Sequence, residues 1–430
     1  MPNLKQTFVT AFALFSLFFG AGNLIFPPLL GLKAGDQWIW VTLGFALSAV
    51  VIPILALFGH SKLQGTMADF CRPISRTFGI VYSIMVYVIA LALPSPRTAS
   101  VTYEMSVAPN FDWSPLWLSS VYFLLVFFFV LNRSKILEII GKYLTPLIII
   151  LLLSIIILGL LADTGPIQES TFTHNFSTGI LEGYQTFDAI GGVVVGGIVV
   201  ISLGLAGDLN YTQKRKTLAR AAMMAGSGLL LIYGGLIALG ANFSSMIETD
   251  DRTELVHFLS EQTLGQFGQT SLGVLVALAC FTTAVGIITG AADFMKGLFG
   301  QKQSVFVATA FVGCLFGVLI GQFDVPYIVE VAIPALMFIY PLTIALVLLN
   351  IAPERWTSKI TFRAVVVATL IFSFPDFLKT IAPGNPLNQS MSQLPLYDQN
   401  MAWVLPAVFT YLLFNLIQKL IEKPKAEASN

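Results

Sequence analysis

Residues 18 to 28 interrupt an apolar segment and read Phe18-Phe19-Gly20-Ala21-Gly22-Asn23-Leu24-Ile25-Phe26-Pro27-Pro28. Glycine lacks a Cβ and proline lacks a backbone N–H, so this composition favours a break in a helix. The helix that restarts after a break offers free N–H groups and a positive dipole end to an anion. We therefore expect Gly20, Ala21, Gly22 and Asn23 to bind a carboxylate. An alternative is that the glycines only allow close helix packing, as small residues do in membranes.

The whole chain is too apolar for a soluble protein. Of its 430 residues, 56% are hydrophobic and 11% are charged, less than half the charged share of about 25% in soluble domains. One bilayer crossing takes about 20 apolar residues, which leaves room for about twelve spans and no large soluble domain. Hydropathy places them near residues 7–30, 37–59, 77–107, 116–131, 136–161, 178–206, 217–241, 270–295, 303–322, 325–350, 360–378 and 400–421. The predicted fold is an all-α polytopic membrane protein.

The distribution of charge predicts the orientation of these spans. The chain has 23 basic and 23 acidic residues, and this balance gives no indication of a nucleic-acid partner. Of the 23 Lys and Arg residues, 19 fall in loops and span ends on the side of the two termini. Lys33, Arg252 and Lys379 fall on the other side, and Arg97 lies within a span. Because basic loops stay inside the cell, both termini are expected to be cytoplasmic.

A second interruption occurs five spans after the first. The sixth span contains Gly183-Tyr184-Gln185-Thr186-Phe187-Asp188, followed by two glycine pairs. A repeat of five spans must insert its second copy upside down, and interrupted helices at matching positions indicate a binding site at the membrane midplane. The predicted units are a first five-helix repeat at 1–161, an inverted repeat at 162–350, helices 11 and 12 at 351–421 and a cytoplasmic tail at 422–430.

Asp188 is an ionisable residue inside a hydrophobic segment, which is costly and therefore indicates a functional site. The unwound backbone around Thr186 and Phe187 is expected to offer carbonyl groups to an ammonium group. The Phe187 ring is expected to close over an apolar side chain. The alternative for Asp188 is a water-exposed acid in an outer vestibule, or a helix cap.

Several segments resemble one known family. Residues 15–28 resemble the first-span signature of the bacterial branched-chain amino acid:cation symporters, and weaker matches lie at residues 96–99, 141–146, 183–189 and 278–284. The resemblance implies a five-plus-five inverted repeat of the leucine-transporter type, with helices 1 and 6 broken and two helices added at the C-terminus. It also implies an amino acid substrate, alternating access, a bacterial cytoplasmic (inner) membrane, and no cofactor other than a coupling Na⁺ or H⁺.

In span 8, Ala279, Thr282 and Thr283 are spaced so that they face one side of a helix. Their carbonyl and hydroxyl oxygens suit a hard monovalent cation, and the spacing resembles the sodium site of leucine-transporter-type proteins. The resemblance adds the carbonyl groups of Ser16 and Phe19 to this site. The alternative is that both threonines bond the carbonyl four residues back in their own helix.

Three further charged residues lie within or at the ends of spans. Lys142, early in span 5, matches a position where lysine replaces sodium in proton-coupled relatives of this fold; alternatively it extends to the cytoplasmic interface. Arg97 and Glu330 lie in the outer parts of spans 3 and 10, and buried charges need partners. We expect them to form a gate over the vestibule. The alternative is that each extends to the outer interface.

Two other classes of protein fit the sequence less well. A membrane enzyme is disfavoured because there is no His-Glu-x-x-His, no Gly-x-Ser-x-Gly and no Cys/His cluster with metal spacing. An ion channel would need a polar pore lining or a filter loop. The predicted function is a secondary active transporter that imports Leu, Ile and Val by cation symport, with sodium favoured. The alternatives are a proton-coupled symporter of another neutral amino acid and an ion channel.

Overall fold

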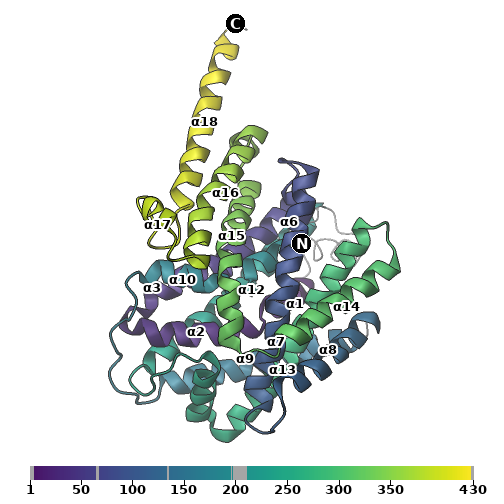
Figure 1. The fold of residues 1–430 in the computed structure, drawn as a ribbon, viewed down its shortest axis with the longest axis vertical. Helices are drawn as coiled ribbons and strands as arrows, with labels where there is room; N and C mark the ends of the chain where they lie inside the picture. Colours follow the sequence, from purple (N-terminus) through teal and green to yellow (C-terminus); the bar gives the residue numbers. More distant parts are fainter. Residues whose placement is uncertain (1–3, 64–66, 133–134, 195, 197–210, 428–430) are drawn as a thin grey trace.

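The computed structural model describes residues 4–63, 67–132, 135–194, 196 and 211–427, and all regular structure in them is helical (Figure 1). The first part of the chain forms α1 (Leu4–Phe18), α2 (Ala21–Ala34), η1 (Gly35–Gln37), α3 (Trp38–Ala46), η2 (Leu47–Val51), α4 (Ile52–Leu63), α5 (Met67–Phe70), α6 (Arg76–Ala92), α7 (Pro94–Thr102), η3 (Tyr103–Val107), α8 (Pro115–Asn132), α9 (Lys135–Leu160) and α10 (Asn175–Tyr184). The second part forms α12 (Tyr211–Asn242), α13 (Arg252–Leu298), α14 (Gln303–Ile320), α15 (Val325–Ile351), η4 (Glu354–Trp356), α16 (Lys359–Ile381), α17 (Pro386–Met391) and α18 (Val404–Glu427).

The helices are those of a multi-pass membrane protein, as the hydropathy predicted. Within the described ranges, eight helical segments are long and apolar enough to cross a bilayer, and three shorter apolar helices accompany them. The sixth expected span runs into residues 197–210, which lie outside the described residues. The total of about twelve and the inverted repeat therefore remain predictions. On α8, Leu124 and Phe128 point outward while Phe123 and Val126 are buried, as expected when lipid covers the outer face.

Three interruptions in the helices lie close to the centre of the molecule. The first is at Phe19 and Gly20, between α1 and α2, where Gly20 is extended (φ −112°, ψ −172°). The second follows α10, and helix resumes at Asp188. The third separates α6 from α7 at Leu93, where Pro94 begins the new helix. Proline suits the first turn of a helix because its missing N–H is not needed there.

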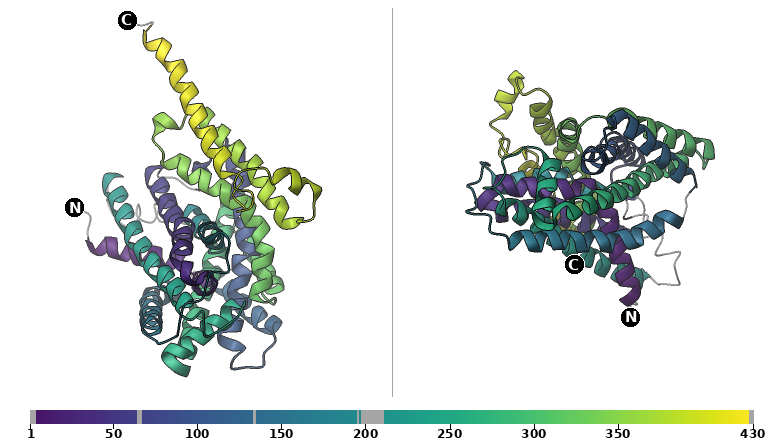
Figure 2. Two further views of the ribbon diagram at one scale, coloured as in Figure 1. Left: turned by 90° about the vertical axis from the view of Figure 1, so that its left-hand side faces the viewer. Right: turned by 90° about the horizontal axis from the view of Figure 1, so that it is seen from below.

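Helices α12 and α13 hold these interruptions together. α12 packs along both α1 and α2, and α13 contacts α2, α7 and α9, so segments far apart in sequence lie side by side (Figure 2). α2 and α12 approach each other closely at two glycines. Gly31 of α2 faces the backbone of α12, and Gly240 of α12 faces the backbone of α2. α13 is bent at Gly265, whose φ of 64° is left-handed. At the other end of the chain, α18 packs on α16 and extends beyond the rest of the molecule (Figure 1).

Candidate functional site

A buried hydrogen-bonded group joins the first break to the second. The Asn23 side-chain amide donates to both oxygens of Asp188, at 3.0 and 2.8 Å, and the Tyr233 hydroxyl donates to Asp188 Oδ2 at 3.0 Å. Asn23 Nδ2 also contacts the Tyr233 hydroxyl. All three side chains are buried. Because they come from α2, from the helix that resumes at 188 and from α12, this group fixes the relative position of three helices.

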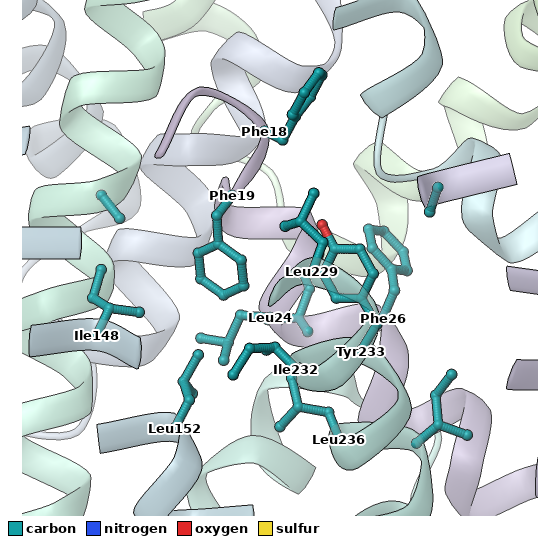
Figure 3. Packing of buried hydrophobic residues seen from close by; sticks show 14 of the residues in the cluster. Phe18, Phe19, Leu24, Phe26, Ile148, Leu152, Leu229, Ile232, Tyr233 and Leu236 are labelled. Atoms are coloured by element: carbon teal, nitrogen blue, oxygen red, sulfur yellow. The ribbon is translucent and has the colours of Figure 1, made fainter. Parts of the chain in front are cut away.

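The aromatic surroundings of this group come from the same elements. Phe19, between α1 and α2, stacks on Phe15 and lies 6.5 Å from the Tyr233 ring centre. Figure 3 shows Phe19 between Ile148 of α9 and the α12 side chains that include Leu229. The first break is therefore enclosed mainly by apolar and aromatic side chains, apart from the polar group at Asn23.

The second break has an unusual backbone. Phe187 has a φ of 62°, a left-handed conformation that is rare for a bulky residue. Residues held in such conformations cluster at functional sites. The Thr186 hydroxyl donates to the Gly183 carbonyl at 2.8 Å and accepts from the Asp188 N–H at 3.3 Å. The side chain of Gln185 is buried, and its Oε1 has no hydrogen-bond partner among the described residues.

Arg97 lies where the two breaks meet. Its side chain is buried, and its Nη2 donates to the Gln185 carbonyl at 2.9 Å. Its Cζ lies 5.0 Å from the Phe26 ring centre and 5.4 Å from the Phe187 ring centre. A Cβ added to Gly22 would lie only 2.6 Å from Nη2. The lack of a side chain at Gly22 therefore makes room for the Arg97 guanidinium.

The expected pair of Arg97 and Glu330 is not formed. Glu330 is exposed on α15, whereas Arg97 is buried, and the two make no ion pair. The ion pair beside Phe26 is instead between Arg252 and Glu182, at 3.4 Å. Hydropathy gives the depth of a charge along its helix but not the direction in which it points, and α15 turns Glu330 outward. Glu330 is therefore not supported as a gate residue.

In the structure, span 8 lies against the first break. A small cavity is lined by Ser16, Phe19, Ala279 and Thr282, together with Thr145 of α9. Its volume is about 10 Å³, close to the minimum that one water molecule needs. Thr283 faces the same break, because a Cβ on Gly20 would lie 3.6 Å from its Oγ1. All five residues of the predicted cation set thus lie around this break.

The two threonine hydroxyls form hydrogen bonds within their own helix, Thr283 to the carbonyl four residues back, as the alternative predicted, and Thr282 to the carbonyl three residues back. Both donate to the Ala279 carbonyl, each at 2.9 Å. This does not exclude cation binding, because a hydroxyl that donates its proton keeps two lone pairs as acceptors. A second small cavity lies beside the first and is apolar, lined by Gly20, Leu24, Leu272 and Val276 among others. A branched side chain would fit there only if these side chains moved apart.

Two predicted site residues have side chains outside the described part of the structure. Ala21 begins α2, and Lys142 lies in α9, but neither side chain is described. Other residues of the site were not predicted, namely Tyr233, Gln185 and Thr145. Tyr233 sits at the middle of an apolar span, and a buried tyrosine hydroxyl generally needs a partner. This requirement is the feature of the sequence that could have identified Tyr233 as a residue of the site.

Comparison with solved structures gives the class of protein. A Na⁺-coupled sialic acid symporter in a substrate-bound outward-open state matches with a TM-score of 0.62, covering 96% of this chain and 90% of that one at 11% identity. Mhp1, a nucleobase-cation-symport-1 family transporter, matches in a closed conformation with a TM-score of 0.59 and 12% identity, covering 97% and 93%. At these identities the likeness establishes the fold alone. The molecule has the multi-pass helical fold of leucine-transporter-type transporters.

Comparison of sequences gives the family. A model of the family described as branched-chain amino acid transport protein matches residues 3–421. The branched-chain amino acid transport system 2 carrier protein of Pseudomonas aeruginosa is 31% identical over 99% of both chains, and the permease BrnQ of Corynebacterium glutamicum is 33% identical over 94% of this chain and 93% of its own. The chain belongs to the branched-chain amino acid transport protein family. This confirms the resemblance found in the sequence, and places the protein among transporters rather than enzymes.

Proposed function

We propose that the protein imports leucine, isoleucine and valine by cation symport, with sodium as the coupling ion, across a bacterial cytoplasmic membrane with both termini inside the cell. The observation that carries the proposal is the buried Asp188, which joins the two interrupted helices through Asn23. In this arrangement the free N–H groups at the start of α2 bind the substrate carboxylate. Asp188 and the carbonyl groups near Thr186 and Phe187 bind its ammonium group.

Family membership supports the substrate class, and the surroundings of the breaks support an apolar side chain. Phe19 and the apolar cavity beside Gly20 offer no charged group to a substrate side chain. The substrate charges are instead matched by backbone groups and by Asp188. Such a site accepts neutral side chains and rejects charged ones, because a charge placed among these residues would lose its hydration without gaining a partner.

The substrate prediction is tested by competition for uptake of labelled leucine into proteoliposomes. An apolar pocket distinguishes side chains that differ by one methylene by only about 1–3 kcal/mol, or roughly 10- to 200-fold. Unlabelled isoleucine and valine are therefore expected to inhibit leucine uptake within that range. Lysine and glutamate are expected not to inhibit it. If lysine competed as well as isoleucine, the proposed substrate class would be wrong.

The coupling ion is proposed from the cavity at the first break. Its oxygen-bearing residues Ser16, Ala279 and Thr282 line one small space, and Thr283 is adjacent. Oxygen ligands suit hard cations. Removing a hydroxyl that contacts an ion is expected to cost about 1.5–3 kcal/mol. Thr282→Ala and Thr283→Ala should therefore each raise the sodium concentration for half-maximal uptake by about 10-fold or more.

Thr369→Ala is the matched control for these two variants. Thr369 is a buried threonine of α16 whose hydroxyl donates to the Val365 carbonyl at 2.8 Å, the same type of bond in a helix remote from the cavity. Its sodium dependence should equal that of the unmodified protein. Normal sodium dependence in the Thr282→Ala, Thr283→Ala double variant would remove these hydroxyls from the cation site. Proton-driven uptake that is lost in Lys142→Ala would assign coupling to a proton.

A further inference from the structure

Arg97 is a buried cation that forms no direct ion pair with any described residue. Its side chain is only 3% exposed, and no carboxylate in the described part of the chain forms an ion pair with it. Its Nη2 bonds a neutral carbonyl, that of Gln185, and its Nε has no hydrogen-bond partner. Buried charges are normally paired, because removing them from water is costly. The guanidinium is therefore available to pair directly with an anion that enters the site from outside the chain.

The guanidinium is positioned toward the junction of the two broken helices. On one side it meets Gly22 and the Phe26 ring of α2, and on the other it meets Gln185 and the Phe187 ring. Two aromatic faces next to a guanidinium hold it in place by cation–π attraction. The guanidinium thus lies against the start of α2, the segment whose backbone N–H groups are proposed to bind the substrate carboxylate.

Asp188 is the complementary case, a buried carboxylate that interacts with Arg97 at a distance but forms no direct ion pair with it. Asn23 and Tyr233 donate hydrogen bonds to it, but no Lys, Arg or His of the described residues forms an ion pair with it. A carboxylate accepts about four hydrogen bonds. Oδ1 receives one of these bonds and Oδ2 receives two, which leaves capacity for a further donor at Oδ1. Gln185, three residues earlier in the second break, has a buried Oε1 that finds no hydrogen-bond partner among the described residues.

We propose that Arg97 binds the carboxylate of a zwitterionic α-amino acid, whose ammonium group is bound by Asp188 and Gln185. The proposal rests on the proposed function and adds a side-chain ligand to the backbone N–H groups of α2. A guanidinium presents donors in a planar arrangement that matches a carboxylate. One buried cation and one buried anion at the same helix breaks match the two opposite charges of an amino acid. Arg97 is thus a substrate ligand, not half of a gate.

The test removes the charge from the protein and from the ligand in turn. Calorimetry measures the affinities of leucine and of leucinol, which keeps the ammonium group and side chain but lacks the carboxylate. In the unmodified protein, leucine is expected to bind at least about 100-fold more tightly than leucinol. In Arg97→Gln, leucine affinity should fall about 100-fold while leucinol affinity changes little. The preference for leucine should then largely disappear.

Arg252→Gln is the matched control. Arg252 also lies over the Phe26 ring, at 4.9 Å, but it has an acidic partner in Glu182. Its substitution is expected to change leucine and leucinol affinity by the same factor, so the preference for leucine stays as in the unmodified protein. If Arg97→Gln is not monodisperse in detergent, Arg97→Lys is compared in the same way, because it keeps the charge but loses the planar group.

Equal weakening of leucine and leucinol in Arg97→Gln would overturn the proposal, since it would show a structural role for Arg97. Affinities for leucine and leucinol that both stay as in the unmodified protein would overturn it too. These results differ from failure of the proposed function, in which the unmodified protein would bind neither leucine nor isoleucine nor valine.

Discussion

Gly22→Val is expected to abolish leucine binding while the protein still inserts and remains monodisperse. A Cβ at Gly22 would lie 2.6 Å from Arg97 Nη2 and 3.0 Å from the Phe26 ring. The branched valine side chain must therefore displace the guanidinium and occupy the space beside the start of α2. Binding through backbone N–H groups requires close approach, which a side chain at this position blocks. The expected loss of leucine affinity, measured by calorimetry, is more than about 100-fold.

Gly20→Ala is the matched comparison for this variant. The structure gives the two glycines of the first break different surroundings. A Cβ at Gly20 meets Thr283 at 3.6 Å, an ordinary contact, and the extended backbone of Gly20 is accessible to alanine. Gly20→Ala should keep leucine affinity within about 10-fold of the unmodified protein. Tight leucine binding by Gly22→Val would show that the substrate is not bound at the first break.

The two main helix breaks were predictable because their causes are local. Gly20 and Gly22 precede a pair of prolines, and the second break carries Gly183 and Asp188 within an apolar span. Both breaks occur at the expected places. The break before Pro94 was not predicted, although proline favours the first turn of a helix. Of the two prolines at this break, only Pro96 entered the sequence argument, as part of the family match at residues 96–99.

The partners of the charged residues could not be predicted in the same way. Asp188 bonds Asn23, which is 165 residues away, and Tyr233, which is 45 residues away. Such pairs depend on how each helix is rotated about its axis, which hydropathy does not give. For the same reason we predicted an ion pair between Arg97 and Glu330 and did not predict the one between Arg252 and Glu182. The residues of the cation set do lie around the first break, and that they bind an ion stays a prediction, which came from the resemblance and not from spacing alone.

Gly240→Ala and Gly234→Ala are expected to change stability in opposite directions, although both replace a glycine inside α12. A Cβ at Gly240 would lie 1.9 Å from the Pro28 carbonyl oxygen and 2.9 Å from the Leu32 nitrogen. These are backbone atoms of α2, so the clash is relieved only if the two helices separate. At Gly31 the same contact is seen from α2, where a Cβ would lie 1.9 Å from the Ile237 carbonyl oxygen.

At Gly234, by contrast, a Cβ would meet only the Thr42 side chain, at 3.5 Å. Alanine there should stabilise the helix by about 0.5–1 kcal/mol, the usual gain over glycine in a helix interior. Overpacking at Gly240 should destabilise the protein by about 3 kcal/mol. The measurement is the midpoint of thermal unfolding in detergent. This midpoint should fall for Gly240→Ala and rise slightly for Gly234→Ala, relative to the unmodified protein. Equal shifts in the two variants would contradict the close approach of α2 and α12.

The Gly240→Ala variant should also lose leucine binding, because α2 and α12 carry Asn23 and Tyr233, which both bond Asp188. Separating the two helices lengthens at least one of these bonds and leaves the carboxylate less well held. Leucine affinity is therefore expected to fall together with stability in Gly240→Ala, and to stay unchanged in Gly234→Ala. A Gly240→Ala protein with a lowered unfolding midpoint but full leucine affinity would show that the network around Asp188 does not depend on the packing of these two helices.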